Sequence, residues 1–116
     1  MFTAYVVVTV AAIVANAGVA IADFARAKFV LATSAEVGVS QSWLPLHGTL
    51  KAAGAAGLLL GLVGVRFIGI AAAAGLVLFF VGAVAAHLRA RVYYNIGFPG
   101  GFLVLAIASL VLAVAR

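Results

Sequence analysis

The chain has 116 residues, of which 68% are hydrophobic and only 8% are charged. Because a soluble domain carries about a quarter charged residues, this composition predicts an integral membrane protein. Seven Lys and Arg residues against two Asp and Glu residues give a net charge of +5. The basic residues stand at the ends of apolar segments, so membrane topology explains them better than nucleic-acid binding does. The absence of cysteine excludes disulfides, thiolate nucleophiles and iron–sulfur clusters.

Four apolar segments follow one another along the chain and predict helices at residues 4–28, 43–63, 67–89 and 98–115. About 20 apolar residues cross a hydrocarbon core of ~30 Å, so each segment is long enough to span the membrane. Pro45 and Pro99 stand near the starts of the second and fourth segments, where the missing N–H of proline is tolerated. The predicted fold is therefore all-α: one polytopic membrane domain over residues 1–116, built as an antiparallel four-helix transmembrane bundle.

The polar stretch between Asp23 and Trp43 is longer than most connections between helices. Two interpretations of this stretch remain open. The first helix continues through Lys28 or beyond until Gly38 breaks it, or a separate amphipathic or re-entrant piece lies over the mouth of the bundle.

Glycines in the second segment indicate tight helix packing. Gly57 and Gly61 form a GxxxG pair, which lets a neighbouring helix approach closely. The same glycine-rich faces also suit a homodimer.

Four spans place both termini on one side of the membrane, together with Arg66 and Arg116. The remaining basic residues lie at the other side: Arg26, Lys28, Arg89 and Arg91, with Lys51 just inside the membrane. The positive-inside rule then predicts a multi-pass protein of the bacterial inner (plasma) membrane, with the termini outside and the two longer loops in the cytoplasm.

Polar residues that do not determine topology collect at that same loop side. Because ionisable groups inside a membrane indicate a functional site by default, we predict a polar pocket at this end of the bundle. The predicted catalytic residues are Asp23, His47 and His87. The predicted substrate-binding residues are Asn16, Trp43, Lys51, Arg89, Tyr94 and Asn95.

Each of these residues also has a structural interpretation. Asp23 would pair with Arg26 at the helix end, Lys51 would extend its ammonium to the headgroups, and Asn16 would hydrogen-bond across a helix pair. No cofactor or metal is assigned, and the spacing does not decide whether His47 and His87 bind a metal or haem.

Acid–base chemistry suits the predicted set. Asp23 would act as the base and either histidine as the acid, while Lys51 or Arg89 would stabilise a developing oxyanion. A cofactor-independent hydrolase or isomerase acting on a small lipophilic molecule, for example by opening an epoxide, is the predicted function.

The second segment reads LPLHGTLKAAGAAGLL over residues 44–59, and the third closes with GAVAAHLR over residues 82–89. In these stretches the chain resembles the DoxX-like family of small four-helix bacterial membrane proteins. Lys51, His87 and Arg89 match positions of that family's pattern, whereas His47 is less expected. The resemblance implies an association with quinone-linked oxidoreductases, so a quinone-binding or anchoring subunit is the alternative function.

A small transporter is a second alternative. Against it, Asp23 and Glu36 both stand at or beyond the membrane edge, whereas a proton-coupled exporter needs an acidic group near mid-membrane. The expected partners are the lipid bilayer and a small lipophilic substrate.

Overall fold

The computed structural model describes residues 2–115, and every regular element in that part of the chain is a helix or a helical turn. Its elements are α1 (Phe2–Phe24), α2 (Lys28–Glu36), the 3-10 turn η1 (Gln41–Trp43), α3 (Leu44–Leu62), α4 (Arg66–Arg89) and α5 (Gly97–Ala115). The all-α prediction is confirmed. The count of four helices is wrong for the described residues, because α2 forms a separate fifth helix.

The first helix ends at Phe24 rather than at residue 28. Arg26 adopts a left-handed backbone with φ 54°, and the N–H of Ala27 donates to the carbonyl of Ala22 at 3.0 Å. This is the hydrogen bond of a Schellman C-cap, which closes a helix. The structure therefore supports the second interpretation of residues 24–42, in which a separate piece follows the first helix.

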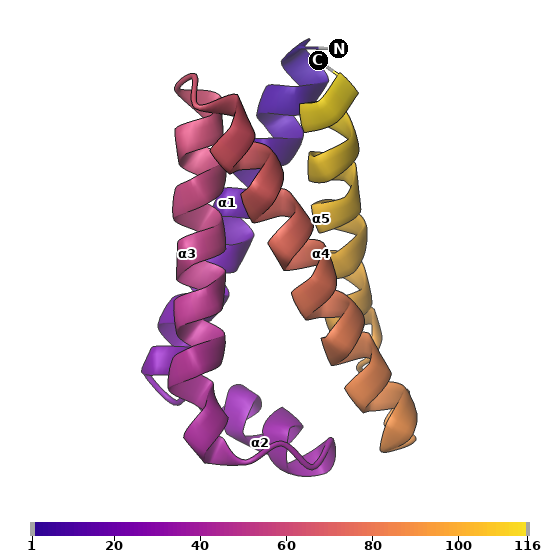
Figure 1. The fold of residues 1–116 in the computed structure, drawn as a ribbon. Helices are drawn as coiled ribbons and strands as arrows, with labels where there is room; N and C mark the ends of the chain where they lie inside the picture. The colour runs from indigo at the N-terminus through magenta and orange to yellow at the C-terminus, as the bar shows by residue number, and fades with distance from the viewer. Residues whose placement is uncertain (1, 116) are drawn as a thin grey trace.

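Helix α2 lies across the end of the molecule that is opposite to the start of α1 and the end of α5 (Figure 1). It ends in a similar way to α1: Gly38 takes φ 75° and the N–H of Val39 donates to the carbonyl of Ser34 at 2.8 Å. Glycine reaches this conformation without the steric strain that a side chain would add. Val30 in α2 and Val37 just after it are buried, so this segment turns apolar side chains towards the rest of the protein.

The four long helices lie side by side. Helix α3 packs against α1 and α4, and α5 packs against α4 and α1. Their shared core consists of Ala12, Leu58, Ala73, Leu76, Phe80 and Ala106. Small residues from every helix let the backbones approach closely, as is common in membrane proteins.

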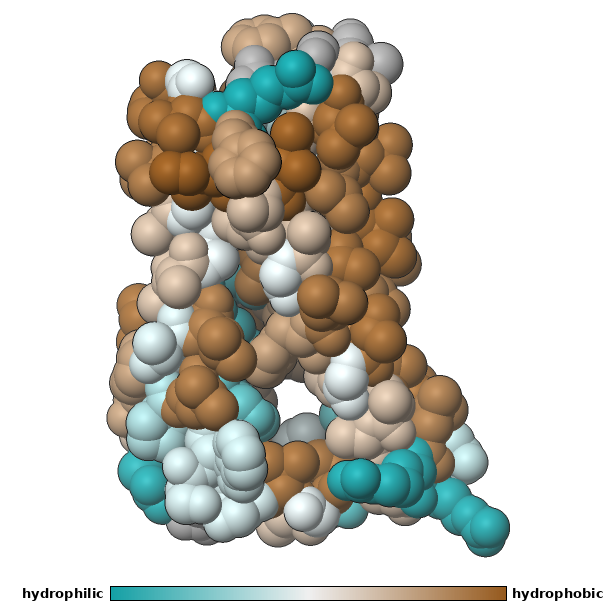
Figure 2. All heavy atoms as spheres, in the orientation of Figure 1, coloured by the Kyte–Doolittle hydropathy of each residue, from teal (hydrophilic) through white to brown (hydrophobic). Residues whose placement is uncertain are grey.

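Three of the described helices, α1, α4 and α5, are long and apolar enough to cross a membrane. Helix α3 is of similar length but carries His47 and Lys51 among its leucines and glycines. Large apolar side chains such as Val7, Leu78 and Val104 are exposed on the outer surface, and brown apolar atoms cover most of the visible face of the upper half in Figure 2. A membrane environment accounts for this surface.

The predicted close approach of a neighbour to the glycines of α3 occurs within the chain, against α4. A Cβ on Gly61 would stand 2.7 Å from the Cα of Gly69, and a Cβ on Gly57 would stand 2.6 Å from the Cβ of Ala72. The two helices nearly touch at this end and diverge towards the end where α2 lies (Figure 1).

Arg66 joins the start of α4 to the end of α5. Its Nη2 donates to the carbonyl of Val114 at 2.7 Å, and its Nε donates to the carbonyl of Ala113 at 3.4 Å. A cation at the last carbonyls of a helix stabilises the helix C-terminus. Arg66 thus has a structural role besides its predicted topological one, and Arg116 lies outside the described residues.

Candidate ligand cavity at the loop end of the helices

A cavity of about 600 Å³ occupies the space where α3 and α4 diverge. Figure 2 shows an opening between these two helices above α2, so the cavity reaches the side of the molecule. Most of its lining is apolar and includes Phe79, Phe80 and Phe98. The polar lining residues are Asp23, Thr33, Ser34, His47, Lys51, His87, Tyr94 and Asn95. An apolar cavity with a few convergent polar groups is typical of a small-molecule site.

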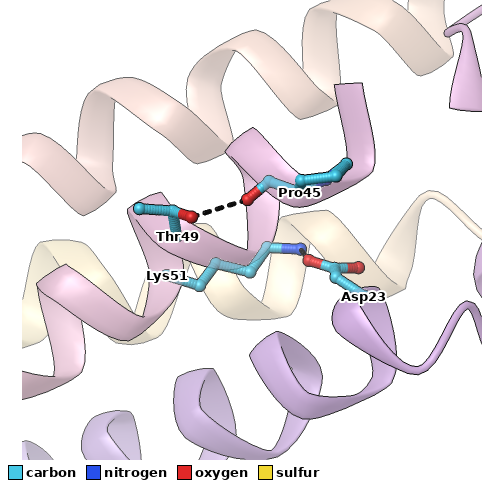
Figure 3. Close-up of polar contacts among 4 residues, drawn as sticks. All are labelled: Asp23, Pro45, Thr49 and Lys51. Carbon is cyan, nitrogen blue, oxygen red and sulfur yellow. Dashed lines mark hydrogen bonds and ion pairs between the residues drawn. The ribbon is translucent and has the colours of Figure 1, made fainter. Parts of the chain in front are cut away.

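An ion pair between α1 and α3 forms part of the wall. Lys51 Nζ lies 2.9 Å from Asp23 Oδ2, and the two side chains are 10% and 2% exposed. Figure 3 shows the lysine side chain running along α3 to meet the carboxylate of the neighbouring helix. The prediction that Lys51 extends to the headgroups is wrong, because Asp23 holds its ammonium inside the protein. In the structure Asp23 pairs with Lys51, which lies 28 positions further along the chain. The sequence reasoning had paired it locally with Arg26.

The exposed hydroxyl of Thr49 lies on the same helix but is satisfied locally. Its Oγ1 donates to the carbonyl of Pro45 at 2.7 Å (Figure 3). A hydroxyl that bonds to the carbonyl four residues earlier presents no unpaired polar group to lipid. Thr49 is not among the residues that line the cavity.

Phe79 of α4 contacts both polar residues of α3, Lys51 and His47. The Lys51 ammonium is 5.2 Å from the centre of its ring, within the range of a cation–π contact. The ring of half-buried His47 meets the same phenylalanine at 5.3 Å between centroids, nearly perpendicular. The phenylalanine therefore fixes the positions of a cation and an imidazole side by side at the cavity wall.

His87, near the end of α4, is 5% exposed. Its Nδ1 lies 3.0 Å from the carbonyl oxygen of Ala83. A carbonyl only accepts hydrogen bonds, so Nδ1 carries a proton and donates it. The other ring nitrogen, Nε2, is buried and has no hydrogen-bond partner among the described residues. Buried polar atoms normally have partners, so this nitrogen needs an explanation.

Glu36 and Tyr94 join the end of α2 to the loop between α4 and α5. The Tyr94 hydroxyl donates to the Glu36 carboxylate, with both carboxylate oxygens at 2.6 Å. This hydrogen bond raises the pKa of Tyr94 above its ordinary value of 10.0, since ionisation would place two negative charges together. The contact holds α2 near the loop that forms the opposite rim of the cavity.

Most of the predicted site residues come together in the cavity: Asp23, His47, Lys51, His87, Tyr94 and Asn95. Three do not line it. Trp43 is 53% exposed and Arg89 is also exposed. Asn16 is buried, and its Nδ2 donates at 2.9 Å to the carbonyl of Ala12 in its own helix rather than across a helix pair. Within residues 2–115, no group of three His, Cys, Asp or Glu side chains is arranged to hold a metal ion.

The sequence reasoning missed the contribution of α2. Val30, Thr33 and Ser34 line the cavity, and Glu36 holds its rim. The sequence shows a short polar stretch followed by Gly38, which is consistent with a short helix. Neither feature predicts where that helix lies relative to the cavity.

Comparisons with known proteins identify the family. A search of curated proteins and a search of solved structures each gave no significant match. A family model described as "DoxX-like family" matches residues 7–109, which include α2, α3 and α4 entirely and most of α1 and α5. The match thus covers every element that lines the cavity, and this membrane protein belongs to the DoxX-like family.

Proposed function

We propose that this protein binds a small lipophilic molecule in the cavity and acts on it by acid–base chemistry, as a cofactor-independent hydrolase or isomerase. The observation that carries the proposal is the buried ion pair Asp23–Lys51 in the wall of an otherwise apolar cavity. Desolvation of two charges offsets much of their attraction, and apolar replacements of such pairs are often as stable. A pair that stability does not require is best explained by function.

The contacts support a proposed role for each group. Asp23 would act as the base, and the Lys51 ammonium beside it would stabilise negative charge that develops on a substrate oxygen. In the neutral ring of His87 the proton is on Nδ1, so Nε2 accepts a proton rather than supplying one. His47 is then the imidazole for the acid role, which the sequence reasoning had left open between the two histidines.

Helix α3 serves as the fourth crossing in this proposal, so that α1, α3, α4 and α5 form an antiparallel transmembrane bundle. Its buried lysine is neutralised by Asp23, and its exposed Thr49 hydroxyl is paired, so little unpaired polarity faces lipid. The opening between α3 and α4 in Figure 2 then faces the bilayer, from which a lipophilic substrate reaches the cavity sideways. The cavity end faces the cytoplasm of a bacterial inner membrane.

The test is a comparison of purified variants in lipid nanodiscs supplied with a lipid extract of the native membrane. We expect mass spectrometry to find a compound that the wild type consumes, with a product of equal mass or of mass increased by one water. Asp23→Asn should abolish this conversion. Thr49→Val, a matched change on α3 outside the cavity, should retain it. If no compound changes in an Asp23-dependent way, the proposed enzyme activity is wrong.

A quinone-binding or anchoring subunit is the second candidate. The observation that favours it is the aromatic wall, in which Phe79 and Phe80 meet at 5.1 Å between centroids beside the cavity, a surface suited to a planar ring. Recovery of a quinone with the purified protein, together with unchanged lipid extracts, would support this candidate over the enzyme. Transport stays the weakest alternative, because Asp23 stands at the last turn of α1, whereas a proton-coupled exporter needs an acidic group near mid-membrane.

A further inference from the structure

We propose that the molecule bound in the cavity carries a hydroxyl group, as a lipophilic alcohol or phenol does, and that this hydroxyl donates a hydrogen bond to Nε2 of His87. The inference rests on the proposed function in one respect, that the cavity binds a lipophilic molecule. It adds the chemical class of that molecule.

Three of the donors in the cavity wall already have acceptors. Lys51 directs its ammonium to Asp23, and the Tyr94 hydroxyl donates to Glu36 at the rim. The Nδ1–H of His87 donates to the carbonyl of Ala83. Each of these three donors has an acceptor inside the protein, whereas the ring of His47 and the hydroxyls of Thr33 and Ser34 also line the cavity.

Two acceptors in the cavity wall, in contrast, are left without partners among the described residues. Nε2 of His87 and Oδ1 of Asn95 are both buried, and neither has a partner among the described residues. Both side chains line the cavity. An acceptor left unsatisfied in a buried site costs roughly 1–3 kcal/mol, so a ligand that supplies a donor removes this penalty.

The identity of Nε2 as an acceptor follows from the fixed partner of the other nitrogen. The Ala83 carbonyl holds the proton on Nδ1, which leaves a lone pair on Nε2 of the neutral ring. A protonated ring would place an N–H without an acceptor in the same buried position. At this position the geometry therefore favours a hydroxyl donor over an ether, ketone, ester or quinone oxygen, which only accepts hydrogen bonds.

The size of the cavity agrees with this class. Its volume of about 600 Å³ lies within the range of small-molecule sites, and its aromatic walls suit an apolar body. Nε2 is at present covered by neighbouring side chains, so the hydroxyl reaches it as the ligand displaces the side chains around the ring. The opening in Figure 2 gives such a molecule a route from the side.

The test compares two probes that differ only in the donor: farnesol and farnesyl methyl ether. Calorimetric titration of the nanodisc-embedded protein, with empty nanodiscs as the blank for lipid partitioning, gives the two dissociation constants. We expect the alcohol to bind about tenfold more tightly than the ether, as one satisfied buried hydrogen bond predicts. His87→Phe should reduce this ratio to near one, and Thr49→Val should leave it unchanged.

Each outcome has one meaning. Equal affinities of the two probes for the wild type would overturn the hydroxyl assignment while leaving the lipophilic cavity in place. Binding of neither probe would overturn both the assignment and the proposed function. If His87→Phe does not fold, a ¹⁵N signal of His87 Nε2 that shifts with farnesol but not with its ether supports the assignment, and an unchanged signal contradicts it.

Discussion

Asp23 and Lys51 stand at positions where two apolar side chains would also suit a membrane protein. Taking both charges out of water costs several kcal/mol per ion, and their attraction at 2.9 Å repays this only because the contact is direct. The two groups therefore depend on each other: each tolerates its buried position because the other is present. This dependence separates the effect of losing one charge from the effect of losing both.

We expect Asp23→Leu and Lys51→Met, taken singly, each to destabilise the protein by about 3–5 kcal/mol, because each leaves an uncompensated buried charge. The double variant should recover most of this loss. Unfolding of the purified protein in mixed micelles measures the three free energies. A double variant whose loss equals the sum of the two single losses would show no coupling between the two charges, which would contradict their dependence on each other.

At this scale the sequence predicted which residues gather but not how they pair. The shared membrane side of Asp23, His47, Lys51 and His87 followed from helix order alone. Whether Asp23 pairs with Lys51 depends on how α1 and α3 are rotated about their axes, and the apolar sequences of the two helices do not specify this rotation. The proton on Nδ1 of His87 depends on one carbonyl contact, and residue spacing alone does not fix the donor and acceptor roles of the two ring nitrogens.

Helix α2 was the element that sequence reasoning left open. Its composition is mixed, with Lys28 at its start and Glu36 at its end, and the first helix was expected to absorb its beginning. What separates the two helices is the left-handed backbone of Arg26, a conformation that non-glycine residues adopt at some energetic cost. No residue pattern in the sequence predicts this backbone conformation. The long helices were predictable to within a few residues at most ends, because their apolar runs match the thickness of a membrane.

The contact between α3 and α4 supports a prediction for the helix pair. Gly61→Ala places a Cβ 2.7 Å from the Cα of Gly69, a backbone atom that moves only with its helix. We expect a loss of about 1–3 kcal/mol in the free energy of unfolding, as for overpacked cores. Gly18→Ala, which meets no atom within 4 Å, is the matched control and should be neutral or slightly stabilising. Equal effects of the two changes would contradict the role of this contact.

Across the whole molecule, the arrangement of the helices sets the proposed orientation. The turn between α3 and α4 lies at the same end as the start of α1, and the 3-10 turn before α3 lies at the other end with α2 (Figure 1). If α3 crosses the membrane, these two turns face opposite sides. The topology therefore depends on α3, which among the described long helices is the one whose composition does not identify it as a span.

Single cysteines test this arrangement cleanly, because the chain contains none. We expect a membrane-impermeant maleimide added to intact cells to label Val65→Cys, at the α3–α4 turn, and to label Ser42→Cys only after the membrane is permeabilised. Labelling of both positions in intact cells would mean that α3 does not cross. The reverse pattern would keep the four crossings and invert the orientation.

Helices α3 and α4 approach most closely at Gly61 and Gly69 and diverge from there towards the cavity (Figure 1). Lys51 lies ten positions from Gly61, about 15 Å along the helix, so a small rotation about the glycine contact becomes a larger displacement at the cavity. Helices tilt to match the thickness of the bilayer around them. We therefore expect the ligand affinity of this protein to change with bilayer thickness, although neither Gly61 nor Gly69 lines the cavity.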